Sequence, residues 1–138
     1  MQIMANMLVM FGFSWMVMAA IIGLLLAKRH EVAVGSLEKI AATGNLAEYH
    51  RVYDAYKWNK LVHVHSFLFS VVAVCVGLAM AKMGYSESAA NGLAIALMLA
   101  PPVWTVGAVR MSKPLMVIAD MTLLFSLIAA AVGMAMVL

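Results

Sequence analysis

Residues 60–69 read Lys-Leu-Val-His-Val-His-Ser-Phe-Leu-Phe, which places two histidines, His63 and His65, where a long apolar run begins. The run is long enough to cross a bilayer as a helix. Ionisable side chains are costly in lipid, and those that occur there usually belong to a functional site. The stretch therefore predicts a membrane helix that carries an imidazole site near one end.

The composition of the whole chain is that of an integral membrane protein. Hydrophobic residues make up 66% of the 138 residues and charged residues 11%, and the mean hydropathy is +1.01; soluble domains carry about 25% charged residues. Apolar runs of the length that crosses a bilayer occupy residues 3–27, 61–81, 89–109 and 114–138. Strand-type alternation is missing from them. We expect an all-α, single-domain, integral membrane four-helix bundle.

The basic residues indicate an orientation. Eight of the nine Lys and Arg residues lie in residues 28–60 or 110–113, and only Lys82 lies on the opposite side. The positive-inside rule places residues 28–60 and 110–113 in the cytoplasm and both termini outside. We expect the protein to lie in the inner membrane of a cell. The net charge of +3 is explained by this anchoring and requires no nucleic acid. The expected partners are the bilayer and other membrane subunits or a second copy.

Residues 28–60 have a helical pattern. We expect Ser36 to cap a short helix that ends at Gly44, and Asn45 with Glu48 to form a capping box for the next helix. That second helix is predicted to start near Leu46 and to run to about residue 83, roughly 50 Å or more. It is longer than a bilayer requires, so its first turns are predicted to extend into the cytoplasm.

An aromatic stripe leads along this extension toward the histidines. Tyr49, Tyr53 and Tyr56 recur at spacings of four and three residues, followed by Lys60 and His63 on the same helical face. An interfacial aromatic belt is one interpretation of the stripe. A docking face for a cytoplasmic partner and the entrance of a proton path, with Tyr56 in it, are the alternatives.

The two histidines face different ways on a helix. Positions two residues apart point roughly 200° apart, so His63 and His65 are not expected to chelate one metal. The His63 face continues into small or weakly polar positions that include Ser66 and Ser70, whereas the His65 face is bulkier. We therefore expect His63 to be the interior ligand of a haem or metal and His65 to face a neighbouring subunit or a second site.

Asp120 is a candidate partner for His63. It lies about two turns into the fourth apolar run, at a depth similar to that of the histidines. An Asp bonded to the far ring nitrogen of a ligating His would fix its tautomer and raise its basicity. A simple buried Asp–His pair is the alternative.

The third run contains Pro101 and Pro102, which are expected to break or kink it because proline lacks an amide donor. Trp104 follows them, so the three residues are candidates for lining a cavity. Small residues that include Gly23 and Gly133 are expected to permit close helix contacts.

The motif Leu61-Val-His63-Val-His65 and the four-helix layout carry a resemblance. They are similar to small uncharacterised membrane proteins with an HxH helix, which are distantly similar to the haem-binding helices of haem-copper oxidase catalytic subunits. The resemblance implies an axial-ligand role for His63 or His65. It does not imply a copper centre, because the other two histidines, His30 and His50, fall in residues 28–60.

Three functions remain open at this point. The first is a subunit of a redox or respiratory complex that binds b-type haem or a metal through His63 and His65 and transfers electrons. The second is a cofactor-free accessory subunit of a larger membrane complex. The third is a small transporter or proton path through His63, Asp120 and a broken third helix. Hydrolase and nucleotide-binding motifs are missing from the sequence, so a non-catalytic or electron-transfer subunit is expected.

Overall fold

The computed structural model describes residues 2–110 and 112–138. Four long helices, α1 (Gln2–Ala42), α2 (Leu46–Ala79), α3 (Glu87–Val109) and α4 (Lys113–Ala135), are joined by short connections, and a 3-10 turn, η1 (Met80–Lys82), extends α2. Each α-helix is long and apolar enough to cross a membrane. The predicted all-helical fold with four long apolar helices is confirmed, and the described part of the chain contains no strand.

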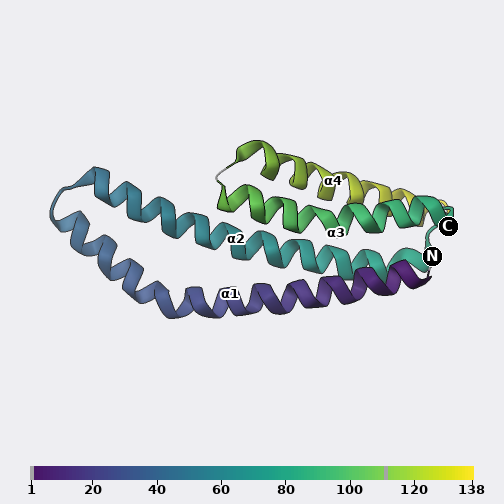
Figure 1. Ribbon diagram of the computed structural model, residues 1–138, viewed down its shortest axis with the longest axis horizontal. Coiled ribbons are helices and arrows are strands. Elements are labelled where there is room, and N and C mark those ends of the chain that lie inside the picture. The colour runs from purple at the N-terminus through teal and green to yellow at the C-terminus, as the bar shows by residue number, and fades with distance from the viewer. Residues whose placement is uncertain (1, 111) are drawn as a thin grey trace.

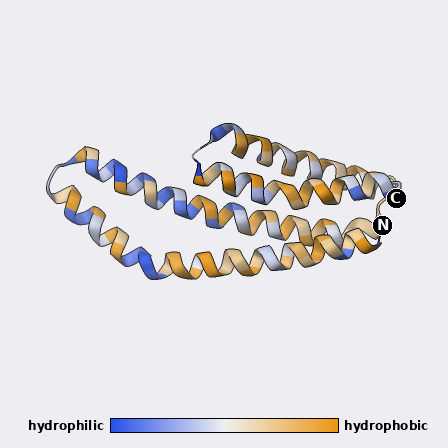
Figure 2. Ribbon diagram, in the orientation of Figure 1, coloured by the Kyte–Doolittle hydropathy of each residue, from blue (hydrophilic) through white to orange (hydrophobic). Residues whose placement is uncertain are grey.

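The helices lie side by side in chain order (Figure 1). Helix α1 packs chiefly against α2, α4 chiefly against α3, and α2 contacts α3. The α1–α2 pair extends well beyond the end of α3 and α4, and both ends of the chain lie at the opposite end of the bundle (Figure 1). Figure 2 shows that the extension is the hydrophilic part of the molecule, whereas the rest is largely apolar. We refer to residues 28–60 as the hairpin extension.

The turn between α1 and α2 follows the predicted signals only in part. Gly44 has φ +71°, the left-handed conformation that glycine adopts at little cost. Asn45 caps α2, because its side chain accepts a hydrogen bond of 3.1 Å from the Glu48 amide. The second half of the capping box is not formed. Arg51 instead donates two hydrogen bonds, of 2.6 and 2.9 Å, to the Glu48 carboxylate and lowers the pKa of that group below its ordinary value.

The predicted separate helix from Ser36 is wrong. Helix α1 is continuous over 41 residues, and the Ser36 hydroxyl donates a 2.7 Å hydrogen bond to the Val32 carbonyl one turn earlier. A serine that bonds to its own helix in this way does not start a new one. The segment also lacks proline, so nothing stops α1 before Gly44.

Of the two outcomes expected at Pro101 and Pro102, a break is excluded, because α3 remains helical to Val109. Two consecutive prolines remove two amide donors, a loss that membrane helices tolerate when neighbouring groups compensate. Thr105 donates a 2.8 Å hydrogen bond to the Pro101 carbonyl. Pro101 is fully buried in the core, whereas Pro102 lines a groove of about 210 Å³ between α3 and α4.

Substitutions at two glycines of the hairpin extension should have opposite effects. Gly44→Ala is expected to lower the free energy of unfolding by about 1 kcal/mol, because alanine is strained at positive φ. Gly35→Ala should raise it by up to about 1 kcal/mol, since Gly35 lies inside α1 and a Cβ there meets nothing within 4 Å. Unfolding of both variants by SDS in detergent micelles checks the signs. Equal effects at the two positions would contradict this turn geometry.

Candidate intramembrane histidine site

His63 lies between α1 and α2. Its Nδ1 is 2.9 Å from the carbonyl oxygen of Ala19, a fully buried residue of α1. A carbonyl oxygen can only accept, so Nδ1 carries the hydrogen and donates it. In the neutral ring Nε2 therefore keeps its lone pair. His63 links the two helices by a side chain to backbone hydrogen bond inside an apolar region.

A glycine makes room for the His63 ring. A Cβ at Gly23 would lie 2.5 Å from His63 Cε1 and 3.0 Å from both ring nitrogens. Real Cβ atoms do not approach as closely as 2.5 Å, so a side chain at this position would displace the imidazole from its place against α1. The prediction that small residues in this part of the chain permit close helix contacts is confirmed at Ala19 and Gly23. The ring edge that carries Nε2 is thus packed on α1.

His65 faces the other neighbour of α2. Its Nδ1 is 3.0 Å from the Leu61 carbonyl one turn earlier in the same helix. Its ring stacks on the indole of Trp104 in α3, with 4.3 Å between ring centroids and 12° between ring planes. By the same reasoning as for His63, Nδ1 donates and Nε2 keeps a lone pair. His65 thus lies inside the chain's own α2–α3 interface, beside a residue expected to line a cavity.

Two buried polar atoms next to His65 have no hydrogen-bond partner among residues 2–110 and 112–138. They are Trp104 Nε1 and Ser66 Oγ, in side chains that are only 3% and 2% exposed. A buried donor without a partner costs about 1 to 3 kcal/mol. Native proteins retain few such groups, and each one needs an explanation. The Trp104 indole stacks on the His65 ring, and Ser66 is the next residue of α2, about 100° around the helix from His65 toward the His63 face.

Trp15 Nε1 in α1 is a further buried donor that lacks a partner in the described residues. Along α1 it lies between Ala19, which bonds to His63, and Gly12, whose Cβ would contact Ser70 and Val74. These contacts fix how α1 and α2 are aligned. Trp15 therefore lies opposite residues of about 67–71 in α2.

Three other predicted site residues make no contact with His63 or His65. Ser70 is satisfied within α2, because its hydroxyl bonds to the carbonyl oxygens of Ser66 and Phe67 at 3.0 and 2.7 Å. Tyr56 lies in the hairpin extension and bonds to His30 at 2.6 Å. Pro102 faces the α3–α4 groove described above.

The expected pair of His63 and Asp120 is not formed. His63 lies on the α1 side of α2, whereas Asp120 belongs to α4, which packs chiefly against α3. The contact between Gly107 and Met116 aligns α3 with α4, so Trp104, three residues before Gly107, lies level with residues 119 and 120. Asp120 is half-buried. It lies at the same depth in the bundle as Trp104 and forms no bond with His63.

The arrangement limits what the histidines can bind. Because His63 contacts α1 and His65 contacts α3, the two rings lie on different sides of α2 and do not share one metal ion. Within the described ranges, the side chains include no cluster of three or more His, Cys, Asp or Glu residues suited to a metal. His65 keeps a ring nitrogen lone pair beside Trp104, whose indole N–H has no partner among the described residues.

Comparisons with protein-family models, with curated proteins and with solved structures each found no match. An interpretation of function therefore depends on the geometry of the chain itself.

Proposed function

We propose that the protein is an integral membrane subunit of a redox assembly and transfers electrons through a b-type haem held by His65. The observation that carries the proposal is the group of His65, Trp104 and Ser66. His65 has a nitrogen lone pair, and the Trp104 indole stacked on it and the hydroxyl of Ser66, the next residue of α2, are buried donors that lack partners in the described part of the chain. The proposal takes the axial role from the resemblance to haem-binding helices and assigns it to His65 instead of His63.

The residues around His65 suit this role. The bond from His65 Nδ1 to the Leu61 carbonyl fixes the tautomer, and such a bond raises the basicity of the opposite nitrogen. Trp104 holds the ring by stacking. A haem would require α2 and α3 to move apart, and Trp104 N–H and Ser66 O–H would then be the donors available for its carboxylates. A haem in this place supplies one-electron redox chemistry, and its second ligand would be a methionine or His65 of a second copy.

His63 has a positioning role in this proposal. Its hydrogen bond to Ala19 and its packing on Gly23 hold α1 against α2. The orientation of α2 in turn sets the direction of His65. His63 thus supports the site without contact to the cofactor.

A cofactor-free accessory subunit is the second candidate. It is favoured by His63, whose place between Ala19 and Gly23 needs no ligand. In that case ordered water would supply the hydrogen-bond partners that Trp104 Nε1 and Ser66 Oγ lack, as it does for buried polar atoms in many proteins. The accessory function would depend on contacts of the apolar helices with other subunits.

The proposed function includes a particular membrane and an orientation of the chain in it. We place the protein in the inner membrane with both termini outside and the hairpin extension in the cytoplasm, as the basic residues indicate. Other membrane subunits or a second copy would contact the exposed apolar side chains of α1 and α4.

The haem content of the purified protein tests the proposal. The protein should be produced in cells supplied with a haem precursor, purified in mild detergent and assayed for protohaem after extraction. We expect one haem for each chain, or one for two chains if His65 of a second copy is the other ligand. A protein that carries less than a tenth of these amounts under ample supply would support the accessory function and exclude the haem.

A further inference from the structure

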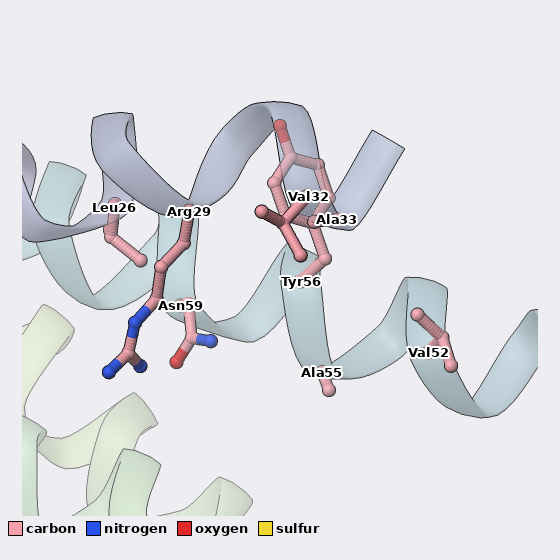
Figure 3. Close-up of a pocket in the computed structure, with 8 residues that line it drawn as sticks. All are labelled: Leu26, Arg29, Val32, Ala33, Val52, Ala55, Tyr56 and Asn59. Atoms are coloured by element: carbon pink, nitrogen blue, oxygen red, sulfur yellow. The ribbon is translucent and has the colours of Figure 1, made fainter. Parts of the chain in front are cut away.

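A cleft of about 390 Å³ lies between α1 and α2 at the start of the hairpin extension. Its lining is mostly apolar, and the polar contributions come from Arg29, Tyr56 and Asn59. Figure 3 shows the side chains of Arg29 and Asn59 directed to the same end of the cleft, on the side that leads toward the bundle. The apolar lining consists of Leu26, Val32, Ala33, Val52 and Ala55.

The cleft lies at the border of the apolar runs. Leu26 is in the last turn of the run over residues 3–27, and Asn59 precedes the run that begins at residue 61. Helix residues advance about 1.5 Å each, so residues 28–33 span roughly 9 Å beyond the hydrocarbon. That distance corresponds to the headgroup region of a bilayer. The Arg29–Asn59 end of the cleft is thus at the depth of lipid phosphates.

The charge around the cleft is positive. Residues 26–33 and 52–60 contain four basic and two acidic side chains. Arg29 is exposed and forms no ion pair with any residue that the structure describes; the one ion pair of the extension joins Arg51 to Glu48. A guanidinium without a partner, beside an amide donor, suits a phosphate group.

One wall of the cleft is held in place by polar contacts. The Tyr56 hydroxyl is 2.6 Å from His30 Nδ1, which links α2 to α1 across the cleft. The Lys60 ammonium lies 4.6 Å from the centre of the Tyr56 ring, within the range of a cation–π contact. The cleft is therefore built into the pairing of the two helices.

We propose that this cleft binds an anionic phospholipid. The lipid phosphate would accept hydrogen bonds from Arg29 and Asn59. The glycerol ester and first methylenes would contact Leu26 on the membrane side, and the headgroup beyond the phosphate would lie along Val32, Ala33, Val52 and Ala55. Basic pockets between membrane helices on the cytoplasmic side are typical sites for anionic lipids. The site is separate from the His65 group and does not depend on a haem.

Native mass spectrometry of the detergent-purified protein with added lipid tests the proposal. We expect phosphatidylglycerol to bind at least about fivefold more tightly than phosphatidylcholine. Arg29→Gln should weaken phosphatidylglycerol binding by about fivefold, the factor that corresponds to about 1 kcal/mol per basic residue at an anionic surface. Lys28→Gln is the matched control, since Lys28 is exposed beside Arg29 but does not line the cleft. It should leave binding unchanged.

A second pair of variants tests the cleft itself. Ala33→Leu places a larger side chain in the cleft and should weaken phosphatidylglycerol binding, whereas Ala42→Leu, at an exposed position that does not line the cleft, should not. Equal retention of the two lipids, or equal losses in Arg29→Gln and Lys28→Gln, would overturn the proposal. Displacement of the lipid by millimolar inorganic phosphate alone would also overturn it, since that result would indicate a site for free phosphate.

Discussion

The substitution Gly12→Leu is expected to destabilise the protein by about 2 to 3 kcal/mol, the upper range for overpacking a well-packed contact. A Cβ at Gly12 would lie 2.7 Å from Val74 Cγ2 and 3.0 Å from the Ser70 carbonyl oxygen and the Val74 amide nitrogen. Backbone atoms have no rotamer that moves them away, so α1 would have to separate from α2. Gly77 makes the reciprocal contact, where a Cβ would meet Val9 Cγ2 at 2.7 Å.

Gly92→Leu is the matched control for this prediction. Gly92 also lies within a membrane-length helix, but it is exposed and a Cβ there meets nothing within 4 Å. We expect this variant to be as stable as the parent or more stable, because leucine is a better helix former than glycine. SDS-induced unfolding in micelles measures both. If the two variants have the same stability, the close approach of α1 and α2 is not as described.

His65→Ala is expected to lower the haem content at least about tenfold, because loss of one axial ligand removes most of the affinity for iron. His63→Ala should retain haem, since that ring contacts α1 and not the His65 group. It should instead lower the free energy of unfolding by about 1 kcal/mol, the value typical of hydrogen bonds between membrane helices. Protohaem extraction and SDS unfolding of each variant separate the two effects.

His50→Ala is the control for the histidine variants. His50 is exposed in the hairpin extension and contacts Tyr49 edge to face. It should change neither haem content nor stability by a measurable amount. A loss of haem in His63→Ala but not in His65→Ala would move the ligand to the α1 side of α2, and retention in both variants would exclude a histidine of α2 as ligand.

The helices themselves were accessible from sequence because each apolar run exceeds the length that a bilayer demands. The start of α2 at Leu46 also followed from local chemistry, since Gly44 and Asn45 act within a few residues. The prediction of a new helix at Ser36 is wrong because a serine hydroxyl can either cap a helix or bond within one. Which of the two it does depends on the fold. The two prolines do not break α3, since a membrane helix can remain continuous when neighbouring groups compensate for lost amide bonds.

The site was predictable only in part. The 3.6-residue period of a helix places His63 and His65 on different faces, as the structure has them. Which helix covers each face depends on packing, and helices that are apolar on all sides give no sign of it. Thus Trp104 as the neighbour of His65, and Ala19 with Gly23 as the neighbours of His63, emerge only from the fold. Asp120 has a depth like that of the histidines, but depth alone does not identify a partner.

The reduced-minus-oxidised visible spectrum of the purified wild-type protein, produced with ample haem precursor, shows whether the chain carries a redox-active b-type haem. We expect an α band in the range of b-type cytochromes that appears on reduction with dithionite and disappears on reoxidation. A protein whose spectrum does not change between the two states would contradict an electron-transfer role for the His65 group.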